Sequence, residues 1–150
     1  MDTLHPLAIH MPLALIFLWP LVDGLGLKLD SPHLKRLGLA MLGGAALFAL
    51  FATVTGQAAF DEAVRQGVDP KLLRTHTENA DLMPWVLLAV LAARAWLPRK
   101  LSHRGHALAL LLGLLVWPLA LGVGKSGGAL VYEHGVGVWK TAIDGGGAKR

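Results

Sequence analysis

Long apolar runs separated by short polar segments make up most of the chain. Four runs, at residues 7–27, 37–60, 80–97 and 107–123, are long enough for helices that cross a bilayer, which need roughly 17–25 mostly apolar residues each. A chain of 150 residues is too short to bury four such helices in any other way. The pattern predicts an all-α fold, a transmembrane four-helix bundle, as a single domain over residues 1–150.

The polar segment between the second and third runs has its own periodicity. Apolar residues recur there at about helical spacing, which is typical of an amphipathic helix at a membrane surface. They are Phe60, Val64, Val68, Leu72 and Leu73. The pattern predicts a short amphipathic segment on the outer end of the bundle, which Pro70 divides into two pieces.

Composition agrees with a membrane protein and narrows its chemistry. Hydrophobic residues form 54% of the chain and charged residues only 16%, against about 25% charged residues in soluble domains. The absence of cysteine excludes disulfides, thiolate catalysis and iron–sulfur clusters held by thiolates. The net charge of +4 comes from basic residues beside apolar runs, a pattern that favours lipid headgroups and argues against nucleic acid.

The distribution of basic residues predicts an orientation. Lys28, Lys35 and Arg36 surround the first polar segment, and the third contains Arg99, Lys100 and Arg104. Because short loops rich in Lys and Arg stay in the cytoplasm, both termini are expected outside. The first run has no basic region before it, which favours a first span over a signal peptide. The expected location is a bacterial inner membrane.

The histidines divide between the two ends of this predicted bundle. His5, His10, His76 and His134 fall at the outer end, and His33, His103 and His106 lie in polar cytoplasmic segments, where lipid headgroups are the expected neighbours. Neutral imidazole binds iron, copper and zinc, and ionisable groups at membrane depth usually face the bundle interior. The outer set is therefore a candidate cofactor or metal site.

Other residues bear on this candidate site. Pro12 predicts a kink beside His10, and a glycine-rich segment leads to Tyr132 and His134. Residues 129–132 and 136–139 are expected to fold back onto the bundle or the bilayer interface, whereas residues 145–150 are expected to be disordered. Asp23 is expected to be an interior partner of Arg94 or a polar contact within the bundle, with a proton relay as the alternative.

A family resemblance rests on several of these residues. The chain contains His5-Pro6-Leu7-Ala8-Ile9-His10-Met11-Pro12, then Asp23, Thr55-Gly56 and His76, and finally the segment from Gly127-Gly128 through Tyr132-Glu133-His134 to Gly137. With these motifs it resembles the bacterial family called domain of unknown function 2231. The resemblance implies a four-span membrane protein, and the Rieske-type or cytochrome-type modules joined to some members imply redox work near a membrane.

Three functions remain open from the sequence. In the first, His10 and His76 bind the iron of a b-type haem for electron transfer, with His5, Tyr132 and His134 nearby or as alternate ligands. In the second, His5, His10, His76 and His134 form a non-haem copper, iron or zinc site. In the third, the protein is a cofactor-free scaffold for a redox partner. Expected partners are the lipid bilayer, a cytochrome, a Rieske-type protein or a quinone, and a second copy of the chain.

Overall fold

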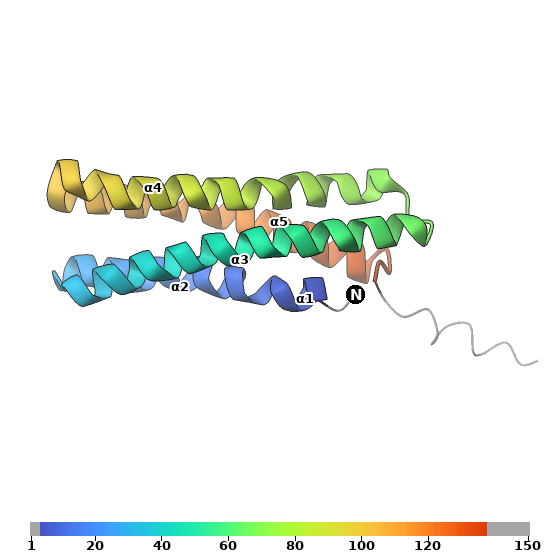
Figure 1. Ribbon diagram of the computed structural model, residues 1–150, viewed down its shortest axis with the longest axis horizontal. Helices are drawn as coiled ribbons and strands as arrows, with labels where there is room; N and C mark the ends of the chain where they lie inside the picture. The colour runs from blue at the N-terminus through green and yellow to red at the C-terminus, as the bar shows by residue number, and fades with distance from the viewer. Residues whose placement is uncertain (1–3, 138–150) are drawn as a thin grey trace, which may run out of the picture.

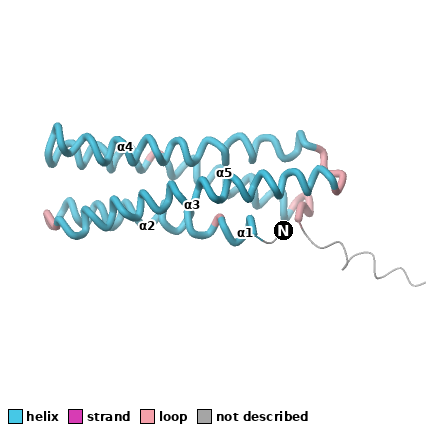
Figure 2. Tube along the Cα trace, in the orientation of Figure 1, coloured by secondary structure: helices cyan, strands magenta, loops and turns pink. Residues whose placement is uncertain are grey.

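The chain forms an elongated bundle of helices. The computed structural model describes residues 4–137, and that range contains only helices and the short loops and turns between them (Figure 2). The elements are α1 (Leu4–Ala8), α2 (His10–Lys28), α3 (Pro32–Arg65), α4 (Pro70–Leu114) and α5 (Val116–Tyr132). In Figure 1, α1, the α3–α4 turn and the end of α5 lie together at one end of the bundle. We call it the His5 end, and the opposite end, with the α2–α3 turn, the Ser31 end.

Two breaks determine how the chain passes along the bundle. Helix α1 ends just before Ile9, because Pro12 has no N–H to donate to the carbonyl of Ala8. Helix α4 is two helices that meet at Ser102, whose φ of 49° and ψ of −127° are not helical. The chain reverses there and returns toward the His5 end (Figure 1). The passes are therefore α1 with α2, α3, the first part of α4, and the second part of α4 with α5.

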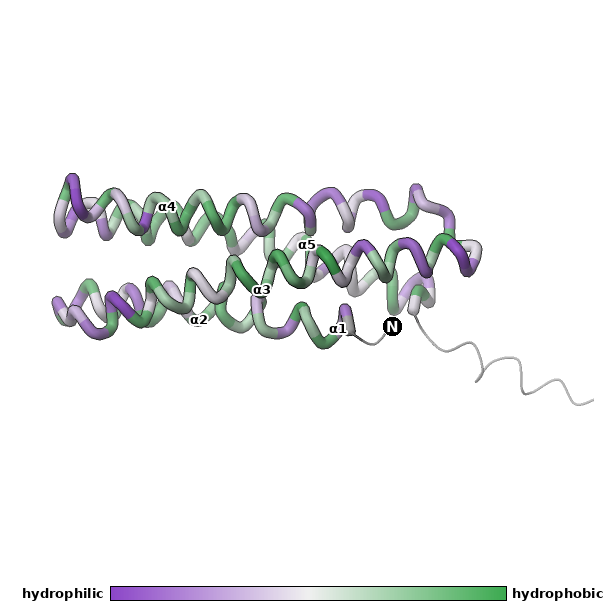
Figure 3. The backbone as a smooth tube through the Cα atoms, viewed as in Figure 1, coloured by the Kyte–Doolittle hydropathy of each residue, from purple (hydrophilic) through white to green (hydrophobic). Residues whose placement is uncertain are grey.

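The helices have the length and surface of membrane-spanning segments. The stretches His5–Lys28, Pro32–Arg65 and Pro70–Tyr132 are all apolar enough to cross a membrane, and the third has 63 residues. A straight helix of that length would measure roughly 95 Å, far more than the bilayer core of about 30 Å, so its reversal at Ser102 is essential. Leu7, Leu115 and Leu121 are among the exposed apolar side chains. Figure 3 shows apolar positions along the middle of the bundle. The predicted all-α, membrane-type fold is confirmed.

The core is built from large side chains opposite small ones. Ile16, Trp19, Leu42 and Leu87 are at most 1% exposed. The ring of Trp19 lies so close to Gly113 that a Cβ atom there would be 2.3 Å from it. This contact brings α2 against the second part of α4 and explains why a glycine is needed in the returning helix.

The segment between α3 and α4 differs from the prediction. It contains no separate amphipathic piece, because α3 continues to Arg65 and α4 begins at Pro70, the first helical position, where Asp69 Oδ1 accepts a hydrogen bond from the backbone N–H of Lys71 at 2.9 Å. Its apolar residues belong to the ends of the two long helices or to the turn. Phe60, Val64, Val68 and Leu73 join Ala63, Leu130 and Val136 in a second core cluster, whereas Leu72 is exposed. Burial against α5 replaces the expected contact with the membrane surface.

The glycine-rich segment agrees with the prediction in part. Residues 122–128 are helical within α5, which continues to Tyr132, so glycine there provides small size within a helix. After α5, Gly135 and Gly137 have positive φ angles, and Val136 packs against the cluster that contains Leu130, as the expected contact with the bundle requires. The predictions for residues 138–139 and for the tail at 145–150 lie outside the described residues.

Candidate functional site

His5 lies in α1, against the middle of α3. Its Nδ1 atom is 3.2 Å from Oγ1 of Thr55. A Cβ atom on the adjacent Gly56 would lie only 3.0 Å from Cε1 of the His5 ring. The missing side chain of Gly56 thus leaves the space that the imidazole occupies, and the ring is partly buried between the two helices.

His76 has the same kind of surroundings on another pair of helices. It lies in α4, and its Nδ1 atom is 3.0 Å from Oγ of Ser126 in α5. A Cβ atom on Gly127 would lie 2.9 Å from Cε1 of this ring. As with His5, a hydroxyl residue followed by glycine holds a partly buried imidazole.

The hydrogen bonds of the two hydroxyls assign the tautomer of each histidine. Thr55 Oγ1 donates to the carbonyl of Ala52 at 3.0 Å, and Ser126 Oγ donates to the carbonyl of Val123 at 3.0 Å. Each hydroxyl proton is thereby used, so each oxygen accepts from the histidine and Nδ1 carries the proton in the neutral ring. The lone pair of each Nε2 then remains available, as required of a histidine that binds a metal.

The structure gives two of the predicted site residues, His5 and His76, the same kind of surroundings, each with a hydroxyl and a glycine from the neighbouring helix. His10 and His134 are exposed, and Tyr132 is 90% exposed. Among residues 4–137, no group of three or more histidine, aspartate or glutamate side chains is arranged to hold a metal ion. Among the predicted site residues, His5 and His76 therefore have partly buried, hydrogen-bonded surroundings, and His10, His134 and Tyr132 lie on the surface.

A second polar cluster lies in the interior, toward the Ser31 end. Arg94 donates to both carboxylate oxygens of Asp23, from Nε to Oδ2 at 2.7 Å and from Nη2 to Oδ1 at 2.8 Å. Nη2 also donates to the carbonyl of Lys35 at 3.1 Å. The expected pairing of Asp23 with Arg94 is confirmed. Gly38 makes room for it, because a Cβ atom there would lie 2.6 Å from Oδ1 of Asp23.

His106 is a member of this cluster that sequence reasoning missed. It was expected in a polar loop, but its side chain is buried and its Nε2 lies 3.1 Å from Oδ1 of Asp23. The break at Ser102 is the reason, since the chain turns there and His106 is already one turn into the returning helix. His33 and His103 are exposed, as their positions in polar segments suggested.

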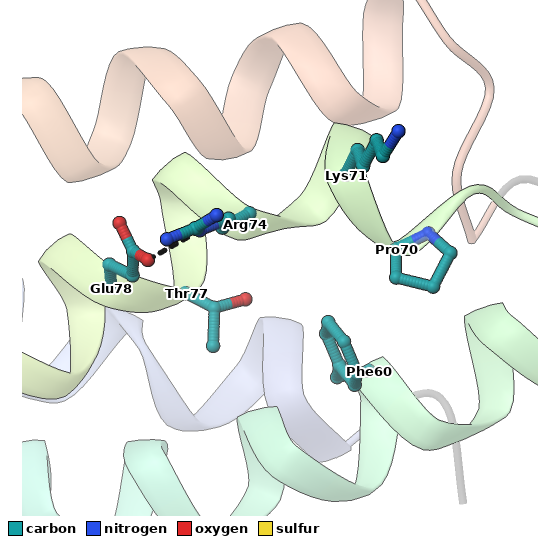
Figure 4. Close-up of a pocket in the computed structure, with 6 residues that line it drawn as sticks. All are labelled: Phe60, Pro70, Lys71, Arg74, Thr77 and Glu78. Carbon is teal, nitrogen blue, oxygen red and sulfur yellow. Dashed lines mark hydrogen bonds and ion pairs between the residues drawn. The ribbon is translucent and has the colours of Figure 1, made fainter.

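The surface hollow shown in Figure 4 does not belong to either cluster. It has a volume of about 300 Å³ and lies where the end of α3 meets the start of α4. Phe60 and Pro70 form its apolar side, and Arg74 donates to Glu78 beside it at 2.7 Å. Neither His5 nor His76 lines this hollow.

A comparison with known protein families agrees with the membrane character of the chain. Residues 1–140 match the model of a family described as "Predicted membrane protein (DUF2231)". The chain belongs to this family. Its match covers both histidine environments and the buried ion pair, so these features lie within the family domain. Neither a curated protein nor a solved structure matches the chain.

Proposed function

We propose that this member of the family is a membrane-bound b-type haem protein that transfers electrons. One observation carries the proposal: two imidazoles from different passes are held in the same way, and the hydrogen bonds of each leave its Nε2 lone pair free. A haem iron in a helical bundle takes its two axial ligands from such histidines. Accordingly, His5 and His76 would be the residues that hold the haem iron.

The number of ligands favours haem over a non-haem metal. Zinc and copper sites need three or four protein ligands, and no such group occurs in the described part of the chain. A porphyrin supplies four nitrogen ligands itself, so a haem requires only two side chains. The competing assignments are the pair of His10 and His76, which the sequence favoured, and a site that uses His134 with Tyr132 beside it; both place a ligand at an exposed histidine.

The residues around the two histidines have defined roles in this proposal. Thr55 and Ser126 hold the Nδ1–H groups, which fixes the ring orientation and keeps Nε2 directed away from the hydroxyl. Gly56 and Gly127 provide the space in which the rings lie. The bound haem would supply a one-electron couple, and the surrounding helices would keep its iron apart from bulk water.

The arrangement of the charged residues supports an orientation for this function. Lys28, Lys35 and Arg99 lie in the helices next to the turns of the Ser31 end, so this end belongs in the cytoplasm. The His5 end would then face outward in a bacterial inner membrane. A cytochrome, a Rieske-type protein or a quinone could exchange electrons with the haem there.

An optical spectrum of the detergent-purified protein tests the proposal. The oxidised and then dithionite-reduced protein should show an intense Soret band that shifts on reduction, with close to one haem per chain. A folded protein without a Soret band, after expression with ample haem, would contradict the proposal. A stoichiometric copper or zinc content would then support the non-haem site, and a protein free of both would support the scaffold function.

A further inference from the structure

The two histidine environments repeat at a constant spacing. His5 and His76, Thr55 and Ser126, and Gly56 and Gly127 are all separated by 71 positions, the same separation as Asp23 and Arg94. Each histidine binds a hydroxyl 50 residues later in the chain. The hydroxyls, in turn, both donate to a carbonyl three residues earlier.

The buried positions of the helices repeat at the same spacing. Eight of the twelve buried residues of α2 and α3 have buried counterparts 71 positions later in α4 and α5. The matched pairs are Pro12 with Met83, Ile16 with Leu87, Trp19 with Val90, Asp23 with Arg94, Gly38 with Ala109, Leu42 with Gly113, Ala45 with Val116 and Ala49 with Ala120. The chain therefore consists of a first hairpin, α1 to α3, and a second hairpin, α4 with α5, that present the same faces to the core.

The reversals of the two hairpins correspond as well. Ser31 precedes α3, and its counterpart Ser102 is the break inside α4. Beside each reversal one glycine allows a close crossing: a Cβ on Gly26 would lie 3.0 Å from that of Leu34, and one on Gly105 would lie 2.2 Å from the carbonyl oxygen of Leu97. Leu97 is the counterpart of Gly26, and Gly105 is the counterpart of Leu34. The glycine lies before the reversal in the first hairpin and after it in the second, and in both hairpins it allows the close crossing.

Counterparts meet each other at two levels of the bundle. Asp23 contacts its own counterpart, Arg94, and the counterparts Lys35 and His106 each contribute one hydrogen bond to this pair. At the other level, His5 and His76 lie within range of an electrostatic interaction, and each has a hydroxyl and a glycine at matching positions. Equivalent positions touch only near the axis that relates two copies, as in an isologous dimer. Both hairpins begin at the His5 end (Figure 1), so that axis runs along the bundle, as in membrane proteins with parallel repeats.

We infer that the chain is two copies of one helical hairpin related by an approximate two-fold axis, and that the cofactor site is made of two equivalent half-sites on this axis. Each half-site supplies one imidazole, one hydroxyl and one glycine. The ligand is therefore a group that accepts one Nε2 from each of two sides. His10 corresponds to Asp81 and His134 to Ala63, so neither has the matched partner that His5 and His76 have.

The identity of the ligand as haem rests on the proposed function, whereas the equivalence of the half-sites does not. Two measurements separate them. In the first, haem content is compared in His5→Ala, His76→Ala, His10→Ala and His134→Ala. The first two substitutions should each lower the haem-to-protein ratio at least tenfold and by similar amounts, and the last two should leave it unchanged.

The second measurement needs no cofactor. Nitrogen-15 NMR of histidine-labelled full-length protein in detergent micelles, after removal of any haem, reports the tautomer of each imidazole. His5 and His76, identified by the signals lost in their alanine variants, should both be protonated at Nδ1. Thr55→Val and Ser126→Ala should each disturb the signals of the histidine that they hold, and by comparable shifts.

The proposed function, the equivalence of the half-sites and the assignment of the ligands are each contradicted by a different result. Absence of haem from the parent protein, together with matched tautomers, would refute the proposed function and keep the two half-sites. Different tautomers for His5 and His76 would overturn the equivalence of the half-sites whatever the haem content. Loss of haem in His10→Ala, with retention in His5→Ala, would overturn the assignment of the ligands.

Discussion

Asp23 and Arg94 form a two-point ion pair in the interior of the bundle, with their charged groups 2.7 and 2.8 Å apart. Asp23 is fully buried and Arg94 is 5% exposed. An ion pair removed from water contributes little net stability, but loss of one partner leaves the other charge buried and unpaired. The pair therefore favours packing of the first hairpin against the second. Two first hairpins would place two aspartates together and two second hairpins two arginines, and these like charges would repel each other.

Arg94→Ala should destabilise the bundle strongly. The carboxylate of Asp23 would lose the partner that offsets its burial, at a cost of about 3–5 kcal/mol. Thermal unfolding of the purified protein in detergent measures the loss. Arg99→Ala is the matched control, since Arg99 is exposed and contacts only a carbonyl of its own helix. Equal melting temperatures for the two variants would contradict the role assigned to the ion pair.

Gly38→Ala should act on the same cluster from the other side. The new methyl group would fall 2.6 Å from Oδ1 of Asp23, so the carboxylate or α3 must move, with a loss of about 1–3 kcal/mol. Gly43→Ala, in the same helix, meets nothing within 4 Å and should be neutral or slightly stabilising because alanine favours helix. The two variants are compared by their unfolding midpoints, and a stable Gly38→Ala protein would show that the carboxylate has room to shift.

Much of the fold follows from hydropathy, and its departures have local causes. The four apolar runs correspond to the four passes, and Asp23 was expected beside Arg94 because an unpaired charge is costly at that depth. The ends of α3 and α4 were misplaced, since the spacing of Phe60 and Val64 suits a membrane surface as well as a helix end. Only the tertiary contact with Leu130 of α5 decides between them.

The candidate site was less predictable. The sequence favoured His10 because it lies deepest in the first apolar run. In the structure His5 contacts Thr55 and Gly56, which are far away in the sequence. One signal was present but overlooked: a histidine followed 50 positions later by threonine or serine and then glycine occurs twice. His106 gave no such signal, because its basic neighbours resemble those of a loop.

Gly56→Ala and Gly127→Ala should each lower haem content while the bundle still folds. The added methyl groups would lie 3.0 and 2.9 Å from Cε1 of His5 and His76, so each ring must shift, which disturbs its hydrogen bond to the hydroxyl. Loss of such a supporting contact typically weakens metal binding by about 10–100-fold. Gly124→Ala is the control, since its Cβ would meet nothing within 4 Å. Haem titration of the three purified proteins measures the difference. Equal haem affinities would show that Gly56 and Gly127 do not contribute to the haem site.

Cysteine labelling tests the orientation. Cysteines at Ser31 and Ser102 lie at the Ser31 end, and one at Gln66 lies in the turn at the His5 end. With intact cells and a reagent that does not cross the membrane, Gln66→Cys should react, and Ser31→Cys and Ser102→Cys should react only after lysis. The reverse pattern would place the His5 end in the cytoplasm.

The coordination of the iron is the most direct test of the central claim that His5 and His76 bind one haem between them. Electron paramagnetic resonance of the oxidised, purified protein measures it. Two imidazole ligands should give a low-spin ferric signal, and His5→Ala and His76→Ala should each convert any haem that remains to a high-spin form with one open position. A high-spin signal in the parent protein, or a low-spin signal that survives both substitutions, would contradict the claim.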